Sequence, residues 1–379
     1  MPGWDGERAA AFRRALLDFY RASARDLPWR GSPRPYDVLV SEFMLQQTRV
    51  EAAIPYFEAW MRRFPDLSAL AGADSEEVLR VWAGLGYYAR ARNLHRAVRE
   101  VVAQRGGEIP DQVEELRALP GVGEYTAAAV ASIAFGARAA TVDGNVRRVL
   151  ARLADEADPS PANLRHWAYQ LLDPEDPGAF NQAMMELGAL VCTPRAPGCG
   201  GCPVATYCRA RAAGTQGERP ARRSPRVVPR SREAVAAVVG ESHGRFFLLF
   251  RKRPEKGLLG GLWELPGVEV GEKEGPHDSA KRLAGGMVRS FEGTGRRDSV
   301  GAGTRLEPLE HVFTHRRLCY LPYLFHVAVK QIPRGASRSL RWVEPACARE
   351  LALPAAQRTL LTRVEEALGV RTISTCEAE

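Results

Sequence analysis

Residues 1–251 of this 379-residue sequence contain no lysine, and the first lysine is Lys252. Arginine carries the positive charge of that stretch. A Schiff base needs a nucleophilic amine, so no side chain before Lys252 can form one with a carbonyl substrate.

Long apolar runs are also missing. No stretch of about 18 apolar residues occurs, so no transmembrane helix and no membrane partner are expected. The segment Met1–Arg14 has no apolar signal core, which predicts a cytoplasmic protein. Seven cysteines, an odd number without a signal peptide, argue against a disulfide framework. We therefore expect Cys319, Cys347 and Cys376 to be reduced thiols.

The charge balance favours a polyanionic partner. The formal net charge is +8 and the isoelectric point is near 9.3. Such a balance suits nucleic acid or an anionic membrane surface, although it serves solubility equally well. Charge alone therefore does not decide between DNA binding and ordinary solvation.

Apolar periodicity divides the chain into helical and strand-like parts. Spacings of three and four residues, as in Phe12–Leu16–Phe19, predict helices through residues 7–208. Residues 209–232 mix arginine with Pro, Gly and Ser, which is typical of a basic linker, either a solvated tether or a DNA contact. We thus predict an all-α domain at 1–208 and a linker at 209–232.

The remaining residues, 233–379, read as a smaller α+β domain. Glu233–Val239 and Arg245–Arg251 flank a glycine-containing turn as a hairpin does. Val312–Val329 has strand composition, and one helix fits around Asp278–Val288. The fold class is therefore multidomain, with an all-α part followed by an α+β part.

Four cysteines form a run of the pattern C-x6-C-x2-C-x5-C: Cys192, Cys199, Cys202 and Cys208. Structural zinc sites usually pair two C-x2-C units, and this run holds only one. The long first loop suits the wider span of a [4Fe–4S] cluster held by four cysteines. Zinc and free thiols remain the alternatives.

The segment Leu119–Gly123 reads as the turn of a helical hairpin. A helix over Asp111–Ala118 ends at Pro120, and another begins near Glu124. Gly121 and Gly123 leave backbone N–H groups open at the second helix, where they and the helix dipole suit a phosphate oxygen. The alternative is a plain helix–helix turn.

Two carboxylates stand at positions that suit catalysis. Glu42 has Val38, Leu39 and Leu45 one helical turn away, and such surroundings raise a carboxyl pKa as a general acid requires. Asp143 opens the next helix after the hairpin and suits an N-cap equally well. For Glu42 the alternative is an ordinary surface position on a helix.

The segment Gly84–Leu94 combines aromatic residues with arginines. A base-flipping enzyme needs a wedge that enters the base stack and cations for the phosphates, and Tyr87 and Arg90 supply these types. The alternatives are core packing for the aromatics and a solvated helix face for the arginines.

In their order from Leu27 to Cys208, these motifs resemble the adenine-glycosylase branch of the helix-hairpin-helix superfamily. The resemblance implies a glycosylase that excises adenine mispaired with 8-oxoguanine or guanine and that carries a [4Fe–4S] cluster. It implies base excision repair on double-stranded DNA by a monomer associated with the nucleoid. The roles it implies are catalysis by Glu42, Asp143 and Tyr125, DNA contact by Gln47, Tyr87, Arg90, Gly121 and Gly123, and an adenine pocket at Trp29, Arg30 and Glu186.

One position separates this branch from its bifunctional relatives. Those relatives resemble this chain but carry a lysine nucleophile in the hairpin, where this chain has Tyr125. The resemblance therefore implies a monofunctional glycosylase without strand-cleaving lyase activity.

The C-terminal part is similar to the Nudix-like domain of adenine glycosylases. Gly261–Gly267 and Phe313–His315 carry this resemblance, with Thr314 where many members have serine. The region around Asp278–Val288 lacks the closely spaced glutamates that would hold Mg²⁺. We therefore expect a binding domain in which Phe313, Thr314 and His315 recognise 8-oxoguanine.

Two other functions remain open at this point. One is a thymine glycosylase of the same superfamily acting at T·G mispairs. The other is a non-enzymatic iron–sulfur protein that binds DNA, in which Glu42 and Asp143 would be structural.

Overall fold

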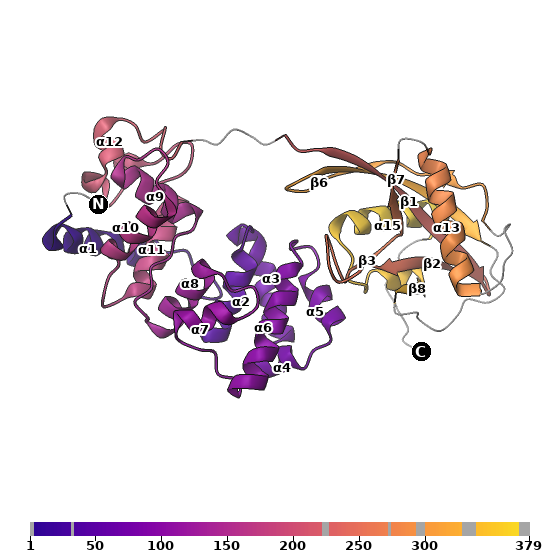
Figure 1. The fold of residues 1–379 in the computed structure, drawn as a ribbon, viewed down its shortest axis with the longest axis horizontal. Coiled ribbons are helices and arrows are strands. Elements are labelled where there is room, and N and C mark those ends of the chain that lie inside the picture. The colour runs from indigo at the N-terminus through magenta and orange to yellow at the C-terminus, as the bar shows by residue number, and fades with distance from the viewer. Residues whose placement is uncertain are drawn as a thin grey trace. The chain divides into compact units, whose positions relative to one another are not determined.

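The computed structural model describes residues 4–31, 34–221, 227–271, 274–292, 300–327 and 339–370 (Figure 1). The chain divides into two compact units, one of Met1–Gly72 with Asn93–Pro225 and one of Ala73–Arg92 with Arg226–Glu379. Among the described residues, no helix has the length and apolar character needed to span a bilayer.

The first unit is helical, as the apolar spacing predicts. Several helices begin at an aspartate or serine whose side chain accepts a hydrogen bond from a first-turn N–H group, and this satisfies donors that the helix itself leaves open. Its helices are α1 (Gly6–Ser23), α2 (Pro35–Leu45), α3 (Val50–Arg63), α4 (Leu67–Ala71), α7 (Val113–Ala118), α8 (Glu124–Phe135), α9 (Gly144–Ala154), α10 (Pro161–Leu171) and α11 (Pro177–Leu190), with most of α6 (Ala89–Arg105).

Two of these helices are buried almost all round. Every residue of α2 from Tyr36 to Met44 is buried, and so are Thr126–Ser132 of α8. Helix α2 packs against α8, and α8 packs against α11. A polar side chain on α2 is therefore removed from water, which matters for Glu42.

The segment after α11 holds the four cysteines. It contains two short 3-10 turns, Cys199–Gly201 and Ala205–Tyr207, which Cys202 and Cys208 directly follow. The expected linker then begins with a helix, α12 (Arg209–Ala213), which buries Ala210 and ends at Gly214 in the left-handed conformation. Thr215 Oγ1 donates to Asp155 Oδ1 at 2.5 Å. The expected linker, starting at residue 209, thus begins with an ordered helix. The sequence did not indicate this helix, because the segment is rich in arginine and only Ala210 in it is buried. Residues 222–226 of that stretch lie outside the described residues.

The second unit is built on a mixed sheet in the order β3-β2-β1-β7-β5. Strands β1 and β2 form the predicted antiparallel hairpin, in which Ser242 pairs with Arg245, while β1 and β7 run parallel. The strands are β1 (Arg230–Ser242), β2 (Arg245–Lys252), β3 (Trp263–Glu264), β4 (Gly267–Glu269), β5 (Thr304–Arg305), β6 (Leu309–Val312), β7 (Arg317–Val327) and β8 (Leu340–Val343), and the helices are α5 (Ser75–Trp82), α13 (Pro276–Glu292), α14 (Pro345–Ala348) and α15 (Ala355–Leu368).

The central strand β1 is buried on both faces. Val235 and its alternate neighbours pack with Leu360 of α15, whereas Ala234 and its alternate neighbours pack with Ala284 of α13. This follows from the two-residue period of a strand. The sheet is therefore the middle layer between α13 and α15.

The scattered cysteines differ from one another. Cys319 is a free thiol, but Cys347 is disulfide-bonded, so the prediction of a reduced thiol is wrong for Cys347. An odd cysteine count argues against a complete framework and does not exclude a single bridge between thiols that the fold brings together. Cys376 lies outside the described residues.

Candidate active site

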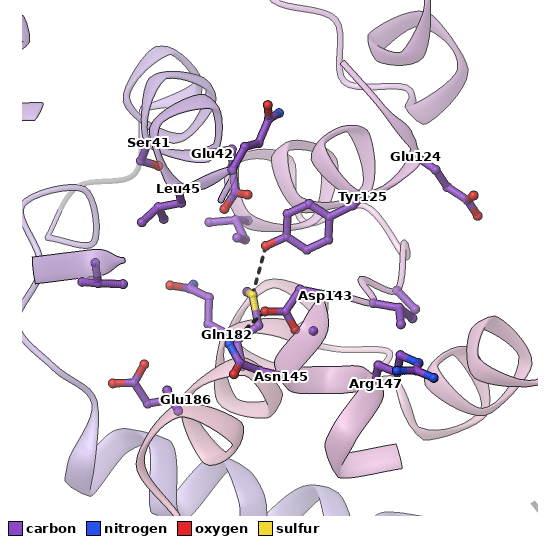
Figure 2. A pocket seen from close by; sticks show the side chains of 18 of the residues that line it. Ser41, Glu42, Leu45, Glu124, Tyr125, Asp143, Asn145, Arg147, Gln182 and Glu186 are labelled. Carbon is purple, nitrogen blue, oxygen red and sulfur yellow. Dashed lines mark hydrogen bonds between the residues drawn. The ribbon is translucent and has the colours of Figure 1, made fainter. Parts of the chain in front are cut away.

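A cavity of about 1070 Å³ lies in the first unit (Figure 2). It collects residues from helices that are far apart in the sequence. Seven of the residues selected from the sequence line it: Trp29, Arg30, Glu42, Gln47, Tyr125, Asp143 and Glu186. Gly121, Gly123, Tyr87 and Arg90 are not among its lining residues, and Phe313–His315 belong to the second unit.

Glu42 enters the cavity from α2 and is only 5% exposed. Burial raises the pKa of its carboxyl to about 7, Asp143 adds to this effect, and the Tyr125 hydroxyl opposes it. Within the described part of the chain, its Oε2 atom has no hydrogen-bond partner. Glu42 therefore holds a proton in a substantial fraction of molecules at neutral pH.

Tyr125 stands in the first turn of α8 and faces the same space as Glu42 and Asp143 (Figure 2). Its hydroxyl donates to Met185 Sδ at 3.1 Å. Burial, and after it the two carboxyls, raise the pKa of this phenol well above its ordinary value. Tyr125 is therefore an uncharged group that contributes no amine.

Asp143 is both the N-cap of α9 and a residue of the cavity. Its Oδ1 accepts from Val146 N at 2.7 Å, and its Oδ2 accepts from Asn145 Nδ2 at 2.9 Å. Burial raises the pKa of Asp143, while these two bonds and the positive charge of Arg148 oppose that rise. The two readings of Asp143 from the sequence, a cap and a functional carboxylate, are thus compatible.

Glu186 on α11 is fully buried, but its surroundings differ from those of Glu42. Arg25 donates to its two oxygens from Nε at 2.8 Å and Nη2 at 3.0 Å, and Arg30 Nη2 donates at 3.0 Å. Burial alone would raise the pKa of Glu186, but these hydrogen bonds lower it to about 2. Glu186 is therefore a fixed anion.

Arg25 and Gln182 are site residues that the motifs did not single out. Gln182 Oε1 accepts from Arg30 Nε at 3.2 Å and from the Tyr20 hydroxyl at 3.0 Å. Gln182 stands four residues before Glu186 on α11, so its helical spacing from that expected site residue was a usable signal. Arg25 carries no local signal, since its carboxylate partners, Glu186 of α11 and Glu51 of α3, come from other parts of the sequence.

A chain of hydrogen bonds leads from Asp143 to the cysteine segment. Arg148 Nη2 donates to Asn145 Oδ1 at 2.9 Å, and Arg148 Nε donates to the carbonyl oxygen of Cys192 at 2.7 Å. The buried Arg152 donates from Nη1 to Cys192 Sγ at 3.1 Å. Helix α9 thus joins the catalytic candidate to the first cysteine of the run.

The four cysteines of the run are free thiols that lie near one another, because each of the other three affects the pKa of Cys202. Three of them pack against the core of α1, α9 and α11. In the ranges that the structure covers, no three His, Cys, Asp or Glu side chains converge as on a single metal ion. Four neighbouring free thiols suit a cluster with four thiolate ligands.

The glycines of the hairpin have different structural requirements. Gly121 has φ of +77°, and a Cβ atom there would lie 2.5 Å from Asn93 Cβ. Gly123 is the N-cap of α8, where no side chain caps the helix, and an added Cβ would meet nothing within 4 Å. Gly121 is therefore required by the fold, whereas Gly123 leaves the helix N-terminus open.

Gln47 and Tyr87 share an unusual backbone conformation. Their φ angles are +59° and +49°, a region that non-glycine residues seldom adopt. Tyr87 is 42% exposed to solvent. Arg90, expected to meet phosphate, is instead 6% exposed, because its guanidinium is turned onto the carbonyl oxygens of Leu85 and Gly86.

In the second unit, the turn between β6 and β7 presents Thr314 and His315 as exposed residues. Phe313 N donates to Arg316 O at 2.8 Å, which closes the turn. The Phe313 ring packs edge-on against His311 with a centroid distance of 4.6 Å. Thr314 and His315 are therefore accessible to solvent, on a turn that the ring contact between Phe313 and His311 stabilises.

Residues 40–173 match the family described as HhH-GPD superfamily base excision DNA repair protein, and residues 235–363 match the NUDIX domain. The adenine DNA glycosylase of Rattus norvegicus is 37% identical over 410 residues, which cover 94% of this chain and 78% of that protein. The Homo sapiens adenine DNA glycosylase is 39% identical over 404 residues, 89% of this chain and 71% of that protein.

Among solved structures, a thermostable thymine-DNA glycosylase is similar at 28% identity with a TM-score of 0.51. The match covers 55% of this chain and 98% of that one. The predicted family and the predicted fold class, a helical domain followed by a Nudix-like α+β domain, are both confirmed. This chain belongs to the adenine DNA glycosylase family.

Proposed function

We propose that this chain acts in base excision repair and hydrolyses the N-glycosidic bond of adenine mispaired with 8-oxoguanine or guanine in duplex DNA. The observation that carries this proposal is the cavity in which Glu42, with a pKa of about 7, meets Tyr125 and Asp143. A carboxylic acid that holds its proton at neutral pH is what protonation of a leaving base requires.

The reaction proceeds through two roles of Glu42. Its carboxylic acid gives a proton to adenine N7, and the bond between N9 and the sugar C1′ breaks with its electron pair moving to the base. The sugar passes through an oxocarbenium-like state, which the Asp143 carboxylate stabilises. The Glu42 carboxylate then takes a proton from the water that attacks C1′, leaving free adenine and an abasic sugar.

Asp143 suits the role of an anion because its carboxylate accepts two hydrogen bonds, from Val146 N and Asn145 Nδ2. Hydrogen bonds to the charged form of a carboxyl favour that form. Trp29, Arg30 and Glu186 line the same cavity and form the proposed adenine pocket. Glu186, held ionised by Arg25 and Arg30, gives this pocket a fixed negative charge.

DNA contact is proposed through the uncapped start of α8 and through exposed aromatic surface. The N–H groups at the uncapped start of α8, directly after Gly123, suit a phosphate oxygen. Tyr87 and Gln47 are the residues proposed to enter the base stack beside the flipped nucleotide.

Lyase activity is proposed to be absent. Tyr125 occupies the hairpin position of a lysine nucleophile, and residues 1–251 contain no lysine. Borohydride added during turnover should trap no covalent adduct between DNA and a side chain of residues 20–208. A strong adduct that maps to this range would contradict the monofunctional assignment.

The four cysteines are proposed to hold a [4Fe–4S] cluster, whose expected task is to shape the loop that contains Arg195. Purified protein should be brown and contain about four iron atoms for each chain. One stoichiometric zinc in colourless protein would contradict this assignment.

The second unit is proposed to read the base opposite adenine. Adenine itself is a normal base, so the lesion signal has to come from 8-oxoguanine, which differs from guanine by N7–H and O8. The exposed Thr314 hydroxyl suits an acceptor for N7–H, and His315 suits a contact to the lesion edge or the backbone. Phe313 supports this turn through its ring contact with His311.

The deciding experiment measures excision from duplexes that contain A·8-oxoguanine, A·G or T·G pairs. We expect adenine release from the first two and no thymine release from the third. Glu42→Gln should abolish excision while duplex binding persists, and Glu58→Gln on the exposed face of α3 is the matched control. Thymine release would favour the T·G alternative, and near-normal turnover by Glu42→Gln would contradict the catalytic assignment.

A further inference from the structure

The turn between α5 and α6 holds Tyr87 in a conformation that its sequence does not favour. Tyr87 has φ of +49°, while Gly84 and Gly86 on either side of Leu85 have φ of +112° and +78°. The left-handed region is unfavourable for a non-glycine residue, because its Cβ approaches the neighbouring carbonyl oxygen. Some other part of the structure must therefore hold this turn in place.

Three neighbouring side chains bind the main chain of the turn. Trp82 Nε1 donates to Gly86 O at 3.0 Å, and the Tyr88 hydroxyl accepts from Gly84 N at 3.1 Å. Arg90 Nη2 donates to Leu85 O at 3.3 Å and to Gly86 O at 3.1 Å. Arg90 is thus the one of these three that binds two successive carbonyl oxygens just before Tyr87.

The Arg90 guanidinium is also flanked by two aromatic rings. Its central carbon lies 5.3 Å from the ring centroid of Trp82 and 5.4 Å from that of Tyr87. These are cation–π distances, and burial strengthens such contacts. Arg90 therefore touches the Tyr87 ring directly and fixes the backbone immediately before it.

We propose that Arg90 is a positioning residue that fixes the ring of Tyr87 for entry into the duplex, instead of a cation that binds a DNA phosphate. This inference rests on the proposed insertion of Tyr87. A group that is 6% exposed and engaged with two carbonyl oxygens and two rings does not present its charge to the surface.

The salt dependence of DNA binding separates the two roles. Loss of one phosphate contact reduces the slope of log K against log salt by about 0.9. We expect Arg90→Gln to keep the wild-type slope and to slow single-turnover excision roughly tenfold to a hundredfold, as misplacement of a substrate-contacting group does. The control Arg96→Gln removes an exposed charge from the same helix and should leave the excision rate near wild type. A slope reduced by about one in Arg90→Gln would overturn the proposal.

A double-mutant cycle tests whether Arg90 acts through Tyr87. Tyr87→Ala, Arg90→Gln and the double variant are compared in excision rate and in the fluorescence of 2-aminopurine placed beside the excised adenine. We expect the double variant to match Tyr87→Ala. Additive losses would overturn the role of Arg90, whereas wild-type behaviour of Tyr87→Ala alone would instead overturn the insertion of Tyr87.

The variant Arg90→Lys keeps the positive charge and provides a second test in case Arg90→Gln does not fold. Lysine has no planar fork and does not stack as guanidinium does. We therefore expect Arg90→Lys to unfold within a few degrees of wild type, to retain the salt slope and to lose most of the 2-aminopurine signal. Full insertion by Arg90→Lys would show that charge alone suffices and would overturn the proposal.

Discussion

At the scale of single residues, two buried glutamates in one cavity have opposite pKa shifts. Glu42 has no arginine bound to it in any described contact, so burial raises its pKa to about 7. Glu186 is also hidden from solvent, but Arg25 and Arg30 lower its pKa to about 2. The two arginine partners therefore make Glu186 an anion, whereas Glu42, which is buried without such a partner, is an acid.

The first prediction is a loss of activity with rising pH. Glu42 must be protonated to act as an acid, so the single-turnover excision rate should fall as pH rises through about 7. The rate is measured between pH 5.5 and 9 (roughly the range that brackets this pKa) with enzyme in excess over an A·8-oxoguanine duplex. A rate that is flat across pH 7 would contradict the proposed proton donor.

The second prediction concerns stability. A carboxyl whose pKa is higher in the folded protein stabilises it only at low pH, and this contribution is lost as pH rises from the unfolded value near 4.5 to about 7. Glu42→Gln should therefore raise the free energy of unfolding above pH 7 by about 1–3 kcal/mol and change it little at pH 4.5. Because Asp143 titrates in both proteins, the difference between them reports on Glu42. Equal denaturation midpoints at pH 8 would count against the raised pKa.

At the scale of elements, the hairpin between α7 and α8 places tight demands on one glycine and none on the other. Gly121 needs a positive φ and has Asn93 of α6 against its Cα, so the hairpin is locked to α6 at this point. Gly123 has open space around it at the uncapped start of α8. The same two-glycine motif thus contains one position without space for a Cβ atom and one position with space for it.

Alanine at the two positions should have different effects. Gly121→Ala combines backbone strain with a Cβ 2.5 Å from Asn93 Cβ, and should cost about 2–4 kcal/mol of folding stability. Gly123→Ala should change stability by less than about 1 kcal/mol but weaken duplex binding, because its methyl group intrudes where the phosphate is proposed to lie. Melting temperatures and duplex affinities of the two variants test this, and equal affinities for wild type and Gly123→Ala would remove the phosphate site.

At the scale of the whole molecule, catalysis and lesion recognition are proposed to lie in different units. The cavity with Glu42 and Asp143 belongs to the first unit, whereas the turn with Thr314 and His315 belongs to the second. Substitutions in one unit should therefore change either the excision of adenine or the preference for the opposite base without changing the other.

Thr314→Ala with His315→Ala in the full chain should keep adenine excision but reduce preference for 8-oxoguanine over guanine. One lost hydrogen bond of about 0.5–1.5 kcal/mol corresponds to roughly a threefold to tenfold loss. The loss should be equal at low and high salt, because it does not arise from phosphate neutralisation. Thr304→Ala with His326→Ala, at exposed positions of the same sheet, is the control. Full preference in the first double variant would place lesion reading elsewhere.

The sequence by itself determined the helices, the β1–β2 hairpin, the four-cysteine run and the tyrosine in place of a lysine. These features depend on spacing, capping and composition, which involve only residues close together in the sequence. Only the tertiary structure decided that Arg25 pairs with Glu186, that Arg90 is buried beneath Tyr87 and that α12 begins the expected linker. The charge state and exposure of a side chain depend on which distant elements surround it, and that information is absent from local sequence pattern.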